Sequence, residues 1–272
     1  MTEAPTELAT EAPTGAVTGA VPGTPTSWLP PQPGPAVRGT VILLPGRGEH
    51  PGVYERFGRR LAADAYTVHA LAARPQDDPA DLRDRIAALV ADAVAPVVLA
   101  GSDTGALHAL ALVTEGKVDV DGLLLAATPG ASAASSAFDA LAGAPQWEQE
   151  LALRTSCPAH RGRLNDDAEF RRGSLFEPVP DRLSAFLHLD APEYAAVTGH
   201  ALVLHGRSDL LAPPALAAAL AARLPRATLA LVRGAPHDVL NDASHRSVAA
   251  AVVQWLEALR TGAPADPIIE YA

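Results

Sequence analysis

The amino-acid sequence predicts an α/β fold, with a mostly parallel sheet of about six or more strands and helices on both faces. Two observations predict it. From residue 37 onward, short apolar runs that end in turn residues alternate with segments of helical periodicity. The apolar runs contain almost no polar residues, which is typical of strands buried on both faces of a parallel sheet. With 272 residues, 48% of them hydrophobic, the chain is long enough to bury a large core.

The first predicted strand, 39–46, is the apolar run GTVILLPG, which ends in a glycine turn. The helix predicted at 53–66 has its apolar residues on one face, acidic residues early and arginines late, as the helix dipole favours. A second strand is predicted at 66–71. The segment 79–94 has leucine and isoleucine at helical spacing and predicts a helix, and 96–101 (PVVLAG) predicts a third strand.

The alternation continues with a helix at 104–114 and a strand at 121–128. Residues of about 131–199 interrupt it, because they mix short helical pieces with a polar loop, and we predict an inserted cap there. The pattern then resumes in the order strand, helix, strand, helix. These elements are predicted at 200–206, 213–224, 227–234 and 243–260.

Residues 1–36 are rich in Pro, Thr, Ala and Gly and have almost no apolar bulk. Such a segment cannot bury enough surface to offset the entropy lost on ordering, so we predict a disordered tail before a domain at 37–272. Trp28 and Leu29 either dock onto the domain or remain exposed.

Composition excludes several classes of function. The net charge of -10 does not favour nucleic-acid binding, no run of 18 apolar residues predicts a membrane span, and the N-terminus lacks the pattern of a secretory signal. The only cysteine, Cys157, excludes an internal disulfide framework, and we expect a cytoplasmic protein. Cys157 and His160 form a C-x-x-H pair, but no second pair completes a metal site, so no metal or other cofactor is expected.

Two further expectations come from the amino-acid composition and from the C-terminal segment. Lys117 is the only lysine, and with the excess of Ala and Pro this indicates a GC-rich, bacterial genome. The C-terminal segment 264–272 (PADPIIEYA) could pack on a second copy, which makes a homodimer possible.

The segment 97–110 (VVLAGSDTGALHAL) has the outline of a nucleophile elbow, G-x-S-x-G, with a displaced centre. In that turn the residues two places either side of the centre must be small. Around Asp103 these are Gly101 and Gly105, whereas around Ser102 they would be Ala100 and Thr104. The turn is therefore predicted to be centred on Asp103.

Four polar turns follow predicted strands. They contain Arg47 with its glycine neighbours, Asp103, Asp209 and His237. The carboxyl ends of parallel strands share one edge of the sheet, where reactive groups of such folds gather. A nucleophile, then an acid, then a histidine is also the chain order of the hydrolases that carry a nucleophile elbow.

With these motifs in order, residues of about 38–260 resemble the α/β-hydrolase fold, and most closely its monoacylglycerol lipase and lysophospholipase branch. The resemblance implies a triad of Asp103, Asp209 and His237, in which Asp209 orients the histidine. It implies an oxyanion hole made by the backbone N–H groups of Arg47 and Thr104. Alternatively, these donors hold the carboxylate of Asp103 in its ionised form. The sequence departs from the branch at Pro45-Gly46, where the family has His-Gly, and at Asp103, where the family has serine.

An aspartate at the elbow changes the expected chemistry. A carboxylate that attacks an ordinary ester forms an anhydride, whereas on a saturated carbon it forms an ester that His237-activated water can cleave. Haloalkane dehalogenases and epoxide hydrolases of this fold use that logic. We therefore predict a hydrolase of a small hydrophobic substrate. The alternatives are a non-hydrolytic biosynthetic enzyme, of cyclase or lyase type, and a catalytically inactive binding protein.

The remaining candidates are possible substrate-binding residues. Glu49 and His50 follow the oxyanion residue and are also suited to bracing its loop, and the Arg47 side chain either binds a substrate carboxylate or is solvated. The other candidates are Ser102, His160 and Tyr194.

Overall fold

The computed structural model describes residues 24–130 and 146–262. Most of the predicted tail, the first part of the predicted cap and the C-terminal segment expected to pack on a second copy lie outside the described residues. No helix in the described ranges combines the length and apolarity that crossing a membrane requires.

The fold is organised around one sheet, in which the described residues contribute seven strands in the order β1-β3-β2-β4-β5-β6-β7. All neighbouring strands are parallel except β1, which pairs antiparallel with β3. The strands are β1 Thr26–Trp28, β2 Gly39–Leu44, β3 Tyr66–Ala70, β4 Val97–Ser102, β5 Gly122–Ala126, β6 His200–Gly206 and β7 Ala227–Val232. The six predicted strands are all present, and the predicted fold class is confirmed.

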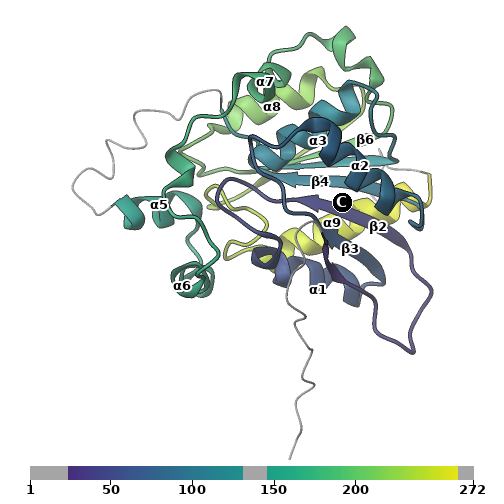
Figure 1. Cartoon of the computed structure of the whole chain (residues 1–272), viewed down its shortest axis with the longest axis horizontal. Helices are drawn as coiled ribbons and strands as arrows, with labels where there is room; N and C mark the ends of the chain where they lie inside the picture. Colours follow the sequence, from purple (N-terminus) through teal and green to yellow (C-terminus); the bar gives the residue numbers. More distant parts are fainter. Residues whose placement is uncertain (1–23, 131–145, 263–272) are drawn as a thin grey trace, which may run out of the picture.

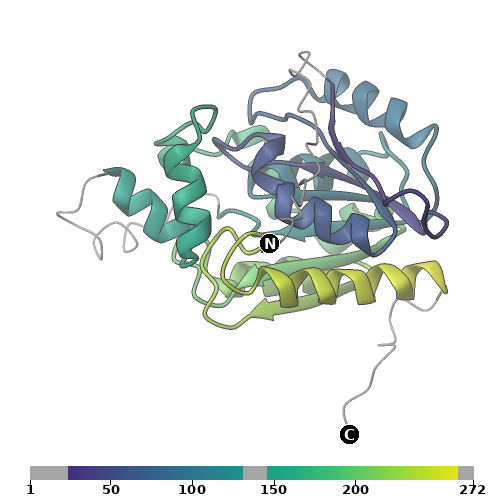
Figure 2. The ribbon, with the colours of Figure 1, turned by 90° about the horizontal axis from the view of Figure 1, so that it is seen from below.

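Helices cover both faces of the sheet (Figure 1, Figure 2). Helices α1 (Glu55–Ala63) and α9 (His245–Arg260) pack on one face, and α2 (Pro79–Val90), α3 (Thr104–Thr114) and α8 (Pro214–Arg223) pack on the other. Successive side chains of a strand point to opposite faces. On β2, Val41 and Leu43 accordingly enter the first core, while Ile42 and Leu44 enter the second.

The register brings the carboxyl ends of the central strands together. Leu44 at the end of β2 pairs with Gly101, and Ser102 at the end of β4 pairs with Ala126. The loops after β2, β4, β6 and β7 therefore emerge from one edge of the sheet, which is the condition that the predicted constellation requires.

The segment between β5 and β6, of which 146–199 is described, consists of short helices and is called the insert below. Its helices are α5 Gln146–Arg154, α6 Pro158–Asp166 and α7 Asp181–Ser184, with 3-10 turns η2 Ser174–Phe176, η3 Ala185–Leu187 and η4 Ala191–Ala196. Helices α5 and α6 form a lobe beside the sheet in both views (Figure 1, Figure 2). Hydrogen bonds from the insert to Gly48 and His237 fix this lobe at the carboxyl edge.

The strand β1 corrects the prediction of a tail through residue 36, which is wrong at 26–28. These residues pair with β3 and form the edge of the sheet, and Ser27 Oγ lies 2.7 Å from His69 Nδ1. Trp28 packs into the core over Gly58 of α1, where a Cβ atom would lie 2.1 Å from the indole ring. Trp28 therefore docks, while Leu29 stays 64% exposed.

Helix boundaries differ slightly from the predictions. The helix expected at 53–66 begins as a 3-10 turn, η1 Pro51–Tyr54, and α1 ends before Ala65, whose φ of 69° is incompatible with a helix. Helix α2 stops at Val90 instead of residue 94. The loop that follows is held by Thr40, whose hydroxyl bonds both the N–H and the carbonyl of Val94.

Candidate active site

Asp103 lies at the centre of a sharp turn between β4 and α3, with φ 51° and ψ -121°. The two flanking glycines are sterically required. A Cβ atom on Gly101 would lie 2.3 Å from the Gly105 carbonyl, and one on Gly105 would lie 2.1 Å from the Leu44 carbonyl oxygen. The left-handed backbone of Asp103 projects its side chain out of the turn, as in a nucleophile elbow. Ser102 is the last residue of β4 and contacts Tyr54 instead.

The Asp103 carboxylate is bound on both oxygens by Arg47, which follows β2. The Arg47 backbone N–H and Nε both donate to Oδ2, at 2.9 and 2.8 Å, and Nη2 donates to Oδ1 at 2.9 Å. The Arg47 Nη1 donates to the carbonyls of Leu175 and Glu177 in the insert, at 3.1 and 2.7 Å. The Arg47 side chain is therefore buried and bound to Asp103 and the insert, and the expectation that it is solvated was wrong. The second predicted oxyanion donor, Thr104, opens helix α3, where backbone N–H groups have no intrahelical acceptor.

His237 lies between two carboxylates. Its Nδ1 is 2.7 Å from Asp209 Oδ2 and its Nε2 is 3.3 Å from Asp103 Oδ1. Asp209 is held in turn by the backbone N–H groups of Leu211 and Ala212, which donate to Oδ1. His205 braces the same turn, because its Nε2 lies 2.7 Å from the Ala212 carbonyl oxygen and 3.2 Å from Asp209 Oδ2.

These four side chains form a row of alternating charge: Arg47, Asp103, His237, Asp209. All four are buried, with Asp103 only 2% exposed. A carboxylate beside each ring nitrogen favours the imidazolium form of His237, which has an N–H donor on both nitrogens. The row then contains two cations and two anions, and its net charge is zero.

Charge complementarity shifts the pKa values in this row. Burial alone would raise the pKa of Asp103, but the charge of Arg47 and the hydrogen bond from His237 hold it well below its ordinary value. Burial opposes protonation of His237, but Asp209 and Asp103 together raise its pKa to about 10. Burial would also raise the pKa of Asp209, but His237 and His205 lower it. These shifts favour the ionised form of Asp103 and the protonated form of His237 in the folded protein.

Glu49 and His50 lie on the loop after β2, where the oxyanion donor Arg47 is predicted. Glu49 Oε2 accepts from the Gly46 backbone N–H at 2.9 Å and from the Tyr54 hydroxyl. His50 Nε2 lies 2.8 Å from Asp167 Oδ2 at the end of α6. Through these contacts Glu49 and His50 stabilise the conformation of the loop after β2.

His160 and Tyr194 occupy different surroundings. His160 is buried on α6, with Nε2 3.4 Å from Oδ2 of Asp238, the residue that follows His237 in the chain. Tyr194 lies in the core that α2, α3 and α8 share, and its hydroxyl donates to the Phe186 carbonyl. That placement does not support the predicted role of Tyr194 in substrate binding.

Arg154 was missed from the sequence. It is the last residue of α5 and fully buried, and it donates to Glu150, Asp238 and the Arg47 carbonyl. The only sequence signal was its i,i+4 spacing from Glu150, which ordinarily marks a solvated helix face. Asp242, which accepts hydrogen bonds from Thr155, Ser156 and Cys157, was also missed, because these partners lie far from it in the sequence.

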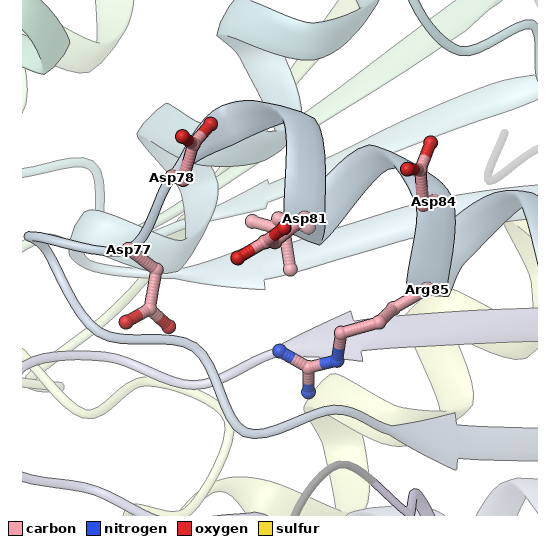
Figure 3. Close-up of a pocket in the computed structure, with 6 residues that line it drawn as sticks. Asp77, Asp78, Asp81, Asp84 and Arg85 are labelled. Carbon is pink, nitrogen blue, oxygen red and sulfur yellow. The ribbon is translucent and has the colours of Figure 1, made fainter.

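A hollow of about 390 Å³ lies away from this row of charges, beside the start of α2 (Figure 3). Its lining residues are Asp77, Asp78, Asp81, Leu82, Asp84 and Arg85. Asp78 caps α2 by accepting from the Ala80 N–H, so part of this acidic surface has a structural role. Among the described residues, no group of three or more His, Cys, Asp or Glu side chains has a geometry suited to a metal ion.

Comparison with known proteins gives a family match and many similar folds. The serine aminopeptidase S33 family matches residues 35–244. No curated protein matches the sequence.

Among solved structures, a monoacylglycerol lipase from Paleococcus ferrophilus is 19% identical, with a TM-score of 0.65 over 86% of this chain and 98% of that chain. A soluble variant of monoglyceride lipase from Saccharomyces cerevisiae, in complex with a substrate analog, is 16% identical, with a TM-score of 0.67 over 86% and 91%. An enol-lactonase from Burkholderia xenovorans is 18% identical, with a TM-score of 0.59 over 88% and 99%. At these identities the likeness shows a common fold.

Proposed function

The chain belongs to the serine aminopeptidase S33 family of α/β-hydrolases, and from this premise we propose how the hydrolase acts. Asp103 is the nucleophile, His237 is the base and Asp209 orients the histidine. The substrate is a small hydrophobic molecule with a leaving group on a saturated carbon. The observation that carries the proposal is the placement of Asp103 Oδ1 3.3 Å from His237 Nε2, while Oδ2 is held by the Arg47 backbone N–H.

The position of Oδ2 favours attack on saturated carbon over attack on a carbonyl. An oxyanion hole normally receives the carbonyl oxygen of the substrate. Here the Arg47 N–H and Nε are already bound to the protein's own Oδ2. A substrate carbonyl therefore competes with an ionised carboxylate for these donors, whereas a saturated carbon needs none of them.

In the first step Oδ1 forms a bond to the substrate carbon and the bond from that carbon to the leaving group breaks. The product is an ester on Asp103, which carries no charge. The imidazolium then has only Asp209 as an anionic neighbour, so the pKa of His237 falls. His237 gives up its proton, to the leaving group where this is oxygen and to solvent where it is halide, and becomes a base.

In the second step His237 takes a proton from water and the oxygen of that water attacks Cγ of Asp103. The charge of the tetrahedral intermediate develops on Oδ2, where the Arg47 N–H and guanidinium stabilise it. The bond from Cγ to Oδ1 breaks, and Oδ1 leaves with the product as an alcohol after protonation by His237. The remaining proton of the water passes from the new carboxyl group to His237, which regenerates the imidazolium and the carboxylate, now with one oxygen from water.

Heavy-oxygen water tests this route. A single turnover with excess enzyme, on n-butyl bromide or styrene oxide, should place the heavy oxygen in the Asp103 peptide and leave the product alcohol unlabelled. His237→Gln should accumulate the ester, seen as an adduct on Asp103 by intact-mass and peptide mass spectrometry. Asp103→Asn should give neither label nor adduct, and turnover with the label only in the product would contradict the nucleophile role.

A second candidate is favoured by the bidentate pairing itself. Because Arg47 saturates both oxygens of Asp103, the carboxylate can serve as a fixed charge that keeps His237 protonated. The imidazolium would then act as an acid in a non-hydrolytic step of cyclase or lyase type, or the site would only bind. Product formation that depends on His237 but leaves Asp103 without label or adduct identifies the non-hydrolytic route.

A further inference from the structure

Arg154 joins the two loops that carry the reacting groups. Its Nη2 donates to the carbonyl of Arg47 at 2.7 Å, and its Nη1 lies 3.4 Å from Asp238 Oδ1, next to His237. We infer that Arg154 is a positioning residue that sets the oxyanion loop and the histidine loop relative to each other across Asp103. The catalytic part of this inference rests on the proposed function.

On the oxyanion side, Arg154 completes a set of bonds around Arg47. The peptide before Arg47 is held by Glu49, whose backbone N–H donates to the Gly46 carbonyl at 3.2 Å, and the peptide after it is held by Arg154. Gly48 has a left-handed φ of 77°, and its carbonyl accepts from the Arg171 N–H of the insert. With both adjacent peptides fixed, the Arg47 N–H has one direction, toward Asp103 Oδ2.

On the histidine side, the end of α5 binds the backbone as well as the side chain. The His237 N–H donates to the Leu153 carbonyl at 3.2 Å, and the Asp238 N–H donates to the Arg154 carbonyl at 2.7 Å. The Asp238 carboxylate lies between Arg154 and His160. The insert is therefore part of the support of His237, and the Arg154 guanidinium is the side chain that links this support to Arg47.

The chemistry of arginine explains why this residue type stands here. A guanidinium presents five N–H groups in a rigid plane and can bind partners in several directions, while an ammonium is a single point of charge. The Arg154 guanidinium donates to four partners: Glu150, Asp238, Ser174 and the Arg47 carbonyl. Its Cζ also lies 4.9 Å from the centre of the Phe170 ring. A buried charge cluster of this kind is a poor source of stability, so a role in holding geometry is the better explanation.

Arg154→Lys tests the inference, with Arg163→Lys as its matched control. Arg163 also joins the insert to the body, through Glu55 at 3.1 Å and the Gly52 carbonyl at 2.6 Å, but it contacts neither Arg47 nor Asp238. Both variants keep the charge and lose the planar fork. In single turnovers, ester breakdown should slow roughly tenfold to a hundredfold in Arg154→Lys and stay within about twofold in Arg163→Lys. Ester formation should change less than breakdown. Only breakdown needs His237, which activates the water, and Arg47, which binds Oδ2, to be placed together around Cγ of Asp103.

Amide hydrogen exchange followed by mass spectrometry gives a readout that needs no substrate. Arg154→Lys should speed exchange in peptides covering 45–50 and 235–242, with the strands unchanged. Asp238→Asn, which keeps the shape of the side chain, should speed exchange at 235–242 alone. Arg163→Lys should alter neither peptide.

Unchanged exchange in both peptides of Arg154→Lys, or equal slowing of ester formation and breakdown in both arginine variants, overturns the inference. A lower melting temperature with unchanged rates for the folded enzyme overturns it as well. If the wild-type protein forms no ester, the proposed function fails, and the exchange pattern alone decides whether Arg154 positions the two loops.

Discussion

The two ends of strand β2 carry the same chemistry in opposite surroundings. Arg38, just before the strand, forms a bidentate pair with Glu257 of α9, and Arg47, just after it, forms a bidentate pair with Asp103. The side chains of Arg38 and Glu257 are 40% and 19% exposed, whereas those of Arg47 and Asp103 are 5% and 2% exposed. The ion pair at the amino edge of the sheet is therefore partly exposed to water, whereas the ion pair at the carboxyl edge is buried.

The difference indicates what each pair is for. A partly exposed pair joins two elements at little cost, and Tyr66 and Arg260 also bind Glu257. Burying two charges costs several kcal/mol per ion, which their attraction offsets only when geometry and hydrogen bonding are excellent. At the carboxyl edge four charged groups are buried in a row, and each carries this desolvation cost. A role in chemistry therefore explains these groups better than a contribution to stability.

The largest effect is expected on breaking the buried pair. Arg47→Gln removes one of the two cations that balance Asp103 and Asp209, which leaves a buried net negative charge, and it should lower the free energy of unfolding by about 3–5 kcal/mol. The measurement is urea unfolding followed by circular dichroism at neutral pH. The double variant Arg47→Gln with Asp103→Asn should recover much of the loss, because it buries no unpaired anion. A double variant as unstable as Arg47→Gln would show that packing of the guanidinium, rather than its charge, dominates.

A smaller effect is expected from pH, through His237. Its pKa is raised from 6.5 to about 10 in the folded protein, so the folded state binds this proton more tightly than the unfolded state does. The stability that this provides is complete below pH 6.5 and is lost as the pH rises toward about 10. Chemical unfolding across this range should therefore show a free energy of unfolding that falls by a few kcal/mol.

His237→Gln is the control for this fall in the free energy of unfolding at alkaline pH. The variant cannot titrate at this position, so its unfolding free energy should change less between pH 6.5 and about 10 than that of the wild type. An equally steep fall in both proteins would assign the pH dependence to other groups. Asp103→Asn should shift the fall in unfolding free energy to lower pH, because one of the two carboxylates that raise the pKa of His237 is lost.

The predictability of these regions follows from the range of the interactions that build them. The elbow could be predicted because its steric requirement is local: Gly101 and Gly105 lie two residues from Asp103. The order of strands and helices could be predicted because hydrophobic periodicity is also local. The direction of the Arg47 side chain could not, because its Nη1 is held by Leu175 and Glu177, far along the chain.

The same reason accounts for the other differences. Trp28 docks because Gly58, in a different element, leaves room for the indole. Arg154 and Glu150 have the spacing of a surface pair, and only the packing of the insert against two loops buries them. Local patterns thus predicted the order of the elements and the turns that carry Asp103, Asp209 and His237, while the long-range side-chain contacts of Arg47 and Arg154 had no local signal.

The smallest effect is expected at the exposed pair and completes the comparison between the two ends of β2. Arg38→Gln should lower the free energy of unfolding by about 1 kcal/mol or less, because the lost partner is replaced by water. Raising the salt concentration to about 1 M should shrink this difference further, since ions screen exposed charges. The same salt should leave the larger effect of Arg47→Gln almost unchanged, because mobile ions do not reach a buried pair. An Arg38→Gln loss as large and as salt-resistant as that of Arg47→Gln would mean that bidentate geometry, and not burial, sets the strength of both pairs.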